Sequence, residues 1–289
     1  MEHYMTSEKI DHYLKALENE ERAAATVEKY RRALLSFAAF LSGAAVSPET
    51  IRLWKNELHE RNYAPSTINT FLAALNGFFH FCGWSDCRAR FLKIQRRLFR
   101  DSRQELTRAE YERLVAAAEA AGDRSLALLM ETICSTGIRV SEVQYITVEA
   151  AKNGKAEIAL KGKIRTILLP SKLCRKLLKF AAQQKTASGA IFRVKSGTAM
   201  SRYQIWSKMK KLCERAGVGA EKVFPHNLRH LFATAFYRAY KDIVKLADVL
   251  GHSSIETTRI YLVTSAAEHR RQLERLQSTV YKGLHRVTV

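Results

Sequence analysis

The sequence predicts a mainly α-helical protein with two domains: a helical N-terminal bundle, and a second, mostly helical domain that carries a small antiparallel β-hairpin or three-stranded sheet. Three observations lead to this prediction. Apolar residues recur at helical spacing along most of the chain, and β-type runs occur only briefly after residue 155. The 289 residues, 47% of them apolar, suffice for two packed cores. A strongly basic segment separates the two halves.

Helical periodicity runs through the first hundred residues. One segment repeats apolar side chains three or four positions apart, at Val27, Tyr30, Leu34, Phe37 and Leu41. The pair Ser47-Pro48 predicts an N-cap followed by proline in the first turn of the next helix. A further apolar helix covers residues 66–82. About four helices in all predict a small bundle, to which we assign residues 1–87.

Residues 88–104 form the predicted linker. Seven basic residues and one acid, Asp101, lie between positions 88 and 103. Such a run can be a solvated surface, but the whole chain carries a net charge of +20. A globular protein this basic usually meets a polyanion, most often nucleic acid. We therefore expect the linker to lie along phosphates, with contacts from Arg88, Arg90, Lys93, Arg96, Arg97 and Arg100.

The sequence argues against a membrane or exported protein. The N-terminus has no basic region followed by an apolar run, so no signal peptide is predicted. The longest uncharged stretch, residues 62–85, is interrupted by polar side chains and predicts a buried helix rather than a membrane span. Five cysteines without an export signal are typical of reduced thiols, which predicts a cytoplasmic protein.

The second domain, residues 105–289, opens with helical signals. Thr107 and Glu110 form a capping box in front of an apolar-periodic helix that ends at Gly122. A further helix follows up to Gly137. This part of the chain therefore continues the helical pattern of the first domain.

After Gly137 the spacing of apolar residues changes from a helical period to that of β-strands. Two short β-type runs, residues 156–160 and 165–169, predict a hairpin. Pro170 begins another helix, and residues 190–194 are a candidate third strand. Everything after Ser201 is predicted to be helical.

No cofactor or metal motif is present. The sequence lacks a P-loop, a dinucleotide fingerprint, a zinc-binding pattern and a nucleophile elbow. It also lacks acidic clusters able to hold Mg²⁺, which most enzymes that act on phosphodiesters use. A route without metal or cofactor needs arginines and lysines to neutralise the transition state, and a side chain as nucleophile. Four short stretches supply such residues.

The first two stretches offer cations. In TGIRVSEV, Arg139 follows a glycine turn and leads into a helix, a setting that favours phosphate. A lone arginine is more often a surface charge. Lys161 lies at the tip of the predicted hairpin, where a lysine can reach into a DNA groove and protonate a leaving 5′ oxygen. Lys163 and Arg165, which we also expect to contact DNA, compete for that position, and a solvated turn is the simpler reading.

The third stretch, PHNLRHLFATAF, offers histidines beside an arginine. His226, Arg229 and His230 share one helical face. A His–Arg pair can hold a phosphate and shuttle a proton. A single histidine is more often satisfied by a backbone carbonyl.

The fourth stretch is LGHSSIETTRIY. His252 lies in a turn between two helices, and residues 253–256 predict a capping box for the second helix. Tyr261 lies at the far end of that helix. A tyrosine at helical spacing usually belongs to the core.

Together the four stretches resemble the tyrosine recombinases, also called the phage integrase family. The motifs follow one another in the family's order: the arginine of TGIRVSEV, a lysine in a hairpin, HNLRH and then LGHSSIETTRIY. TVEKYRRALLSFAAFL and PSTINTFLAALNGFFHF are similar to the family's helical core-binding domain, and LTRAEYERLVAAA to the start of its catalytic domain. The resemblance therefore covers nearly the whole chain and implies the tyrosine recombinase fold.

The resemblance implies a role for each matching residue. Tyr261 is the expected nucleophile, which attacks a DNA phosphodiester to give a 3′-phosphotyrosyl link and a free 5′ hydroxyl. Arg139 and Arg229 are expected to hold the non-bridging oxygens, and Lys161 to be the general acid. Lys163 stays open as an alternative to Lys161. His226 is expected to be an acid–base partner, and His252 to form a hydrogen bond with the phosphate. Glu142 is expected to support the site, and His230 to have a structural role.

The resemblance also implies partners: double-stranded DNA with paired inverted-repeat sites, and four protomers on two DNA sites that are monomers when free. No metal, cofactor or ATP is implied, since the covalent link conserves the energy of the phosphodiester. The chain is similar to minimal two-domain recombinases of the Xer or transposon-integrase type, from a bacterium or a mobile element, acting on the nucleoid. A last helix, residues 269–287, is expected to dock on its own domain or on a neighbouring protomer.

Three other readings remain open from the sequence. A non-catalytic regulator fits the helix-turn-helix pattern of residues 242–262 and the basic charge, but does not need the full catalytic set. A type IB topoisomerase shares the chemistry but relaxes supercoils with little site preference. A recombinase can also resolve chromosome dimers instead of moving a genetic element.

Overall fold

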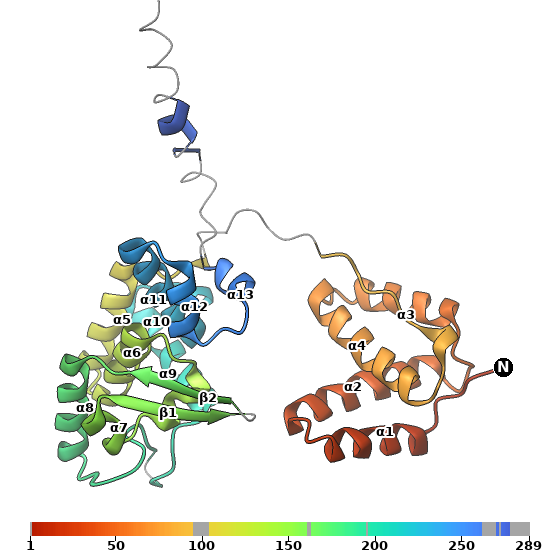
Figure 1. Cartoon of the computed structure of the whole chain (residues 1–289), viewed down its shortest axis with the longest axis horizontal. Coiled ribbons are helices and arrows are strands. Elements are labelled where there is room, and N and C mark those ends of the chain that lie inside the picture. The colour runs from red at the N-terminus through yellow and green to blue at the C-terminus, as the bar shows by residue number, and fades with distance from the viewer. Residues whose placement is uncertain are drawn as a thin grey trace, which may run out of the picture. The chain divides into compact units, whose positions relative to one another are not determined.

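The structure is a computed structural model that describes residues 2–94, 104–160, 163–194, 196–261, 270–271 and 273–277; for Leu160 and Lys163 it describes the backbone alone. The chain divides into two compact units, residues 1–96 and 97–289 (Figure 1). Each unit has its own apolar core. The division falls inside the basic segment that separates the two halves of the sequence.

The first unit is a helical bundle. Its largest buried side chains include Phe37, Trp54 and Phe78, which come from three different helices. Helices predicted around residues 27–41, from residue 48 and over residues 66–82 are confirmed. The elements are α1 (Ser7–Asn19), α2 (Ala24–Leu41), α3 (Pro48–Glu60), α4 (Pro65–Phe81) and the short 3₁₀ helix η1 (Ser85–Cys87).

Local signals explain where α3 begins. The backbone N–H of Thr50 donates to Oγ of Ser47 at 3.1 Å, and the N–H of Ser47 donates to Oγ1 of Thr50 at 2.9 Å. This reciprocal pair satisfies two donors that a helix start would otherwise leave unpaired. Pro48 occupies the first turn, where its missing N–H removes no helical bond.

The chain after η1 runs back along α4. Asn76 accepts from the N–H of Ala89 at 2.8 Å and donates to its carbonyl at 3.0 Å. Asn69 makes the same pair of bonds with Leu92, at 2.8 and 2.9 Å. Two side-chain amides thus fix the first part of the basic segment to the bundle.

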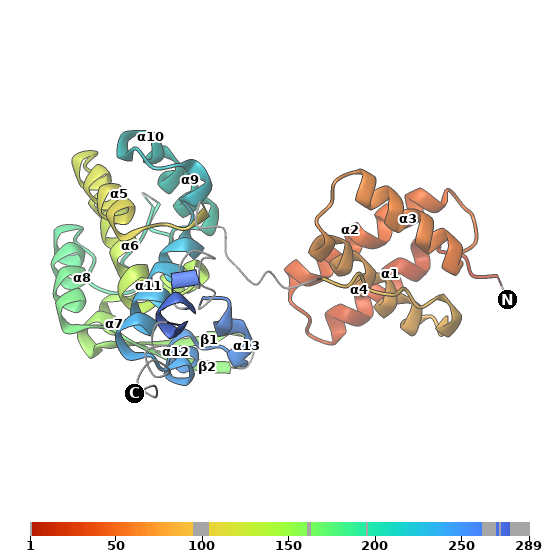
Figure 2. The ribbon, with the colours of Figure 1, turned by 90° about the horizontal axis from the view of Figure 1, so that it is seen from above.

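The second unit is built around α6. This helix buries most of its side chains and packs against α5, α8, α9 and α11 (Figure 2). The capping box of Thr107 and Glu110 is confirmed. The elements up to the hairpin are α5 (Arg108–Ala120), α6 (Arg124–Thr136), η3 (Val140–Tyr145), α7 (Val148–Asn153), β1 (Lys155–Leu160) and β2 (Lys163–Leu168).

The predicted hairpin is confirmed, but the third strand is not. β1 and β2 pair antiparallel, with Lys155 opposite Leu168 and Ile158 opposite Arg165. Residues 190–194 form only isolated bridges, from Ala190 and Arg193 to two different segments. Glycines with positive φ at positions 189 and 197 turn the chain on either side of this segment, and its two bridge partners, Thr147 and Ala199, do not belong to one strand. The sheet of the described residues therefore has two strands.

Helices make up the chain after Ser201, as predicted for the described part. Gly251, with φ +61°, ends α12, and Ser254 caps α13, one residue later than the box expected from Ser253. The elements are α8 (Ser171–Gln183), α9 (Arg202–Lys211), α10 (Cys213–Ala216), η4 (Ala220–Lys222), α11 (Pro225–Tyr240), α12 (Ile243–Leu250) and α13 (Ile255–Arg259).

The last predicted helix, residues 269–287, falls largely outside the described residues. Those that are described, 270–271 and 273–277, are helical, with Leu273 and Leu276 exposed. None of the helices in the part of the chain that the structure describes combines the length and the apolar character needed to cross a membrane.

Candidate active site

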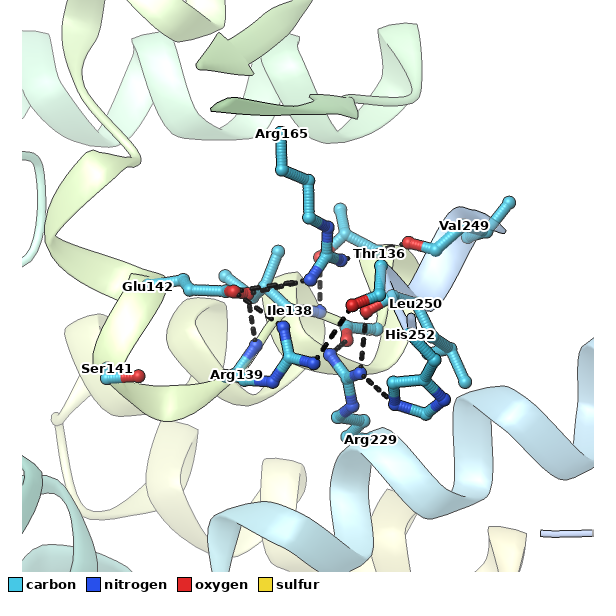
Figure 3. A network of polar contacts seen from close by, with 12 residues as sticks. Thr136, Ile138, Arg139, Ser141, Glu142, Arg165, Arg229, Val249, Leu250 and His252 are labelled. Carbon is cyan, nitrogen blue, oxygen red and sulfur yellow. Dashed lines mark hydrogen bonds and ion pairs between the residues drawn. The ribbon is translucent and has the colours of Figure 1, made fainter. Parts of the chain in front are cut away.

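The structure brings six of the predicted catalytic and supporting residues together in the second unit: Arg139, Glu142, His226, Arg229, His252 and Tyr261. They come from η3, from α11 and from the segment that follows α12. Figure 3 shows the polar network to which Arg139, Glu142, Arg229 and His252 belong. Lys161 lies outside the described residues.

Arg139 is positioned by a sharp turn at the end of α6. Gly137 has φ +66° and packs on Phe232, so that a Cβ there would lie 2.5 Å from the ring. The turn leaves Arg139 at the start of η3. Its NH1 donates to Oε1 of Glu142 at 2.9 Å, and its NH2 to the carbonyl of Gly251 at 3.2 Å. The side chain is 41% exposed, so its guanidinium is held and still accessible.

Glu142 is the acid that balances this cluster. Its side chain is buried, and its Oε2 also accepts from the backbone N–H of Arg139 at 2.8 Å. The same carboxylate accepts from NH1 of Arg165 at 3.2 Å. A buried carboxylate shared by two arginines keeps both guanidinium groups in place and offsets part of their mutual repulsion.

Arg229 is the most deeply buried of the arginines, at 2% exposure. NH1 donates to the carbonyl of Gly137, and NH2 to the carbonyl of Leu250 at 2.8 Å. Burial lowers the pKa of Arg229, while a hydrogen bond with Tyr261 raises it. The guanidinium therefore connects the turn after α6, the end of α12 and the tyrosine.

His252 has a defined tautomer. NH2 of Arg229 lies 2.9 Å from Nε2 of His252. A guanidinium only donates, so Nε2 accepts, and the ring proton must be on Nδ1. Nδ1 lies 2.8 Å from Oγ1 of Thr258, a fully buried hydroxyl. Burial, and then the nearby arginines, lower the pKa of His252 to about 4, so the ring is neutral near pH 7.

Tyr261 lies just beyond α13 and is buried at 4% exposure. Its ring packs with Ala233, Leu246 and Leu250, as a core tyrosine does. Three histidine rings also surround it: His252 is stacked at 5.8 Å between centroids, His230 meets it edge-on at 4.9 Å, and His226 lies at 6.0 Å. The tyrosine is thus part of a core and part of the polar site.

The sequence analysis assigned Arg165 another role and did not identify Thr258. Arg165 was expected at DNA, but its side chain is 15% exposed, and it donates to Glu142 and, at 2.9 Å, to the carbonyl of Val249. Thr258 had no signal at all. Arg165 acts on a distant carboxylate and on a backbone carbonyl, which a motif does not reveal. Thr258 acts on the side chain of His252, six positions before it.

The remaining predicted DNA contacts are only partly described. Arg88, Arg90 and Lys93 are exposed on the first unit. The side chain of Lys163, and all of Arg96, Arg97 and Arg100, lie outside the described residues. Within the described ranges, His3, Asp86 and Cys87 form the group of potential metal ligands, and they lie in the first unit rather than at this site.

Comparisons with known proteins identify both units. Residues 104–268 match the model of the phage integrase family, and residues 10–85 match the model of the N-terminal SAM-like domain of phage integrases. A tyrosine recombinase XerA of Pyrococcus furiosus is 28% identical over 282 residues, which cover 94% of each chain. A tyrosine recombinase XerD of Brucella suis is 30% identical over 284 residues, covering 87% of this chain and 91% of the relative.

Solved structures share the fold. A lambda integrase dimer bound to a COC′ core site matches with a TM-score of 0.74 at 18% identity, covering 90% of this chain and 77% of that one. XerH bound to a difH substrate matches with a TM-score of 0.68 at 20% identity, covering 92% and 84%. Because the family model matches more than half of its residues, this chain belongs to the phage integrase family, the tyrosine recombinases.

Proposed function

We propose that this tyrosine recombinase cleaves and rejoins DNA at specific sites, with Tyr261 as its nucleophile. The observation that carries the proposal is the convergence of Tyr261 with the buried Arg229 and with His252, in a chain whose family consists of tyrosine recombinases. Residues 105–289 form the catalytic domain, residues 1–87 the DNA-binding bundle, and residues 88–104 the linker in this assignment.

The chemical step is a transesterification. The phenol oxygen of Tyr261 attacks the phosphorus, the bond to the 5′ oxygen breaks, and a 3′-phosphotyrosyl link and a 5′ hydroxyl result. The phenol proton passes to a base, for which His226 is the candidate next to the ring. Attack by a 5′ hydroxyl of another strand reverses the step, so the exchange consumes no ATP and uses no cofactor.

Arg139 and Arg229 neutralise the non-bridging oxygens in the transition state. Their guanidinium groups are already fixed by Glu142 and by backbone carbonyls. Fixed donors need little reorganisation when charge develops on the phosphate, and removing one such donor typically costs about 10²–10³ in rate.

Two further residues act on the phosphate and the leaving group. A phosphate between the arginines weakens the positive field that lowers the pKa of His252, so phosphate binding and protonation of His252 favour each other. A protonated His252 can then donate to the phosphate. Lys161, next to a glycine in the hairpin connection, protonates the 5′ oxygen, and Lys163 is its alternative.

The substrate of this enzyme is double-stranded DNA that carries paired inverted-repeat sites. Exposed basic residues on the bundle, Arg88, Arg90 and Lys93, contact phosphates. Four protomers act on two DNA sites, and the free protein is a monomer. A lambda integrase structure described as a tetramer on a Holliday junction supports this arrangement by analogy of fold. Such a substrate puts the enzyme with the nucleoid in the cytoplasm.

Covalent capture tests the proposal. The protein and Tyr261→Phe are incubated in EDTA with nicked duplexes that carry a random central region, and SDS-resistant adducts are isolated and sequenced. We expect adducts only with the tyrosine, on a shared inverted repeat. The control is DNA binding by Tyr261→Phe, which should be intact.

Other outcomes each contradict part of the proposal. An adduct with Tyr261→Phe would move the nucleophile to another residue. Adducts without sequence preference would favour a topoisomerase, and loss of adducts in EDTA would indicate a metal enzyme. Tight DNA binding by the protein without any adduct would favour a non-catalytic regulator.

A further inference from the structure

Three consecutive backbone carbonyls at the end of α12 each accept a hydrogen bond from a different arginine. The carbonyl of Val249 accepts from Arg165 at 2.9 Å, that of Leu250 from Arg229 at 2.8 Å and that of Gly251 from Arg139 at 3.2 Å. Carbonyls in the last turn of a helix have no partner within the helix and lie at the negative end of its dipole. The end of α12 is therefore an acceptor surface that sets the positions of three guanidinium groups (Figure 3).

Arg165 has no role in the proposed reaction, yet it is built into this surface. It extends from β2, and its NH1 lies 3.2 and 3.4 Å from the two carboxylate oxygens of Glu142. Its NH2 is occupied by the carbonyl of Val249. The side chain thus ties β2 to the acid that holds Arg139 and to the helix end that holds Arg229. Both terminal nitrogens bind protein acceptors, and Nε is buried, so the guanidinium is enclosed by the protein around it.

Gly251 makes room for this side chain. A Cβ at position 251 would lie 2.4 Å from Cδ, 2.5 Å from Nε and 2.8 Å from Cζ of Arg165. The residue also has φ +61°, a conformation that glycine adopts without strain. A side chain at this position would push Arg165 away from both of its acceptors.

We propose that Arg165, accommodated by Gly251, is a positioning residue that holds Arg139 and Arg229 at the separation needed to grip one phosphate. The inference rests on the proposed function of those two arginines. Without Arg165, the carboxylate of Glu142 pairs with Arg139 alone and can follow it, and the carbonyl of Val249 loses its donor. The surface that fixes both catalytic arginines then loosens, although neither of them has been changed.

The test compares Arg165→Gln and Arg165→Lys with the parent protein in single-turnover cleavage of a nicked duplex at saturating DNA. A second substrate carries a methylphosphonate at the scissile position, which replaces one charged oxygen with a neutral methyl group. Arginines that neutralise this charge are less needed on the neutral linkage. We expect Arg165→Gln to lose about 10- to 100-fold in rate on the phosphate and less than about 5-fold on the methylphosphonate.

Lysine is not expected to restore the rate, because one ammonium group cannot reproduce the planar fork that reaches Glu142 and Val249 together. Gly251→Ala should reproduce the defect of Arg165→Gln. Arg108→Gln is the matched control: its side chain is exposed in the same unit and pairs with Glu112. It should cleave both substrates like the parent. Melting temperatures verify that each variant is folded at the assay temperature.

The results separate this inference from the proposed function. An Arg165→Gln rate lowered equally on both linkages, or a weakened DNA affinity with an unchanged rate, would overturn the positioning role. An Arg165→Gln protein that cleaves like Arg108→Gln would also overturn it and leave the proposed function intact. A parent protein that forms no adduct with Tyr261 would reject the proposed function itself.

Discussion

Arg32 and Glu28 pair at 2.8 Å on the surface of the bundle, with side chains 75% and 50% exposed. Arg139 and Arg165 pair instead with a Glu142 that is almost completely enclosed. The difference extends to the whole described part of the chain. Its buried polar and charged side chains are Thr132, Thr136, Glu142, Thr186, Asn227, Arg229, His230 and Thr258, and all of them belong to the second unit.

Burying charge is expensive unless every charge is paired and hydrogen-bonded. The bundle avoids that cost by using aromatic and aliphatic side chains for its core and by leaving its ion pairs in water, where each contributes little. In the second unit the two charged side chains of the described residues that are almost completely buried, Glu142 and Arg229, lie in the network at the end of α12. The comparison teaches that the buried charge of the described residues gathers at the site where we propose that the chemistry takes place, although an apolar core does not need such charge.

The largest effect that this comparison predicts is the loss of cleavage rate in Arg229→Ala. Cleavage should slow by about 10³-fold or more, because a fixed guanidinium no longer meets the transition-state charge. DNA affinity should change little. Single-turnover adduct formation and fluorescence anisotropy measure the two quantities separately. The matched variant in the bundle, Arg32→Ala, should leave both within about twofold. Cleavage by Arg229→Ala at the parent rate would remove the arginine from the mechanism.

A smaller effect is expected at Thr258. Replacing it with valine removes the acceptor for Nδ1 of His252, so that Arg229 alone still orients the ring and selects its tautomer. One lost hydrogen bond of about 1 kcal/mol corresponds to a rate about 5- to 10-fold lower. Thr258→Ser keeps the hydroxyl and should restore the rate. Equal rates for the valine and serine variants would show that the hydroxyl does not act on His252.

The smallest effect is expected on the surface of the bundle. Arg90→Gln should leave the rate at saturating DNA unchanged and weaken binding slightly. The slope of log affinity against log salt should fall by about one unit, as it does when one phosphate contact is lost. Titrations at several salt concentrations measure this slope. A slope equal to that of the parent protein would exclude Arg90 from the DNA interface.

The sequence was informative wherever a structure depends on neighbouring residues. Capping pairs such as Thr107 with Glu110 lie three residues apart, and the hairpin connects adjacent runs, so both were predicted. The site residues Arg139, Arg229, His252 and Tyr261 were found because their motifs resemble those of a family. The spacing of residues alone did not bring them together.

The sequence did not predict contacts between residues far apart in the chain or contacts to backbone atoms. The bond from Arg165 to Val249 spans 84 positions and ends on a carbonyl, an atom that every residue has. The asparagines that hold residues 89 and 92 on α4 also act on backbone atoms. The third strand was wrongly predicted because the composition of residues 190–194 does not reveal that their bridge partners come from two segments.

The carbonyl triplet at the end of α12 also limits how this chain can vary. Its acceptors are main-chain atoms, so exposed side chains of the helix can be exchanged without altering them. One inserted or deleted residue, however, rotates everything beyond it by about 100° and moves it by about 1.5 Å along the axis. All three arginines would then face the wrong carbonyl. Between Asp242 and Gly251 we therefore expect the protein to tolerate substitutions of exposed residues but not insertions or deletions.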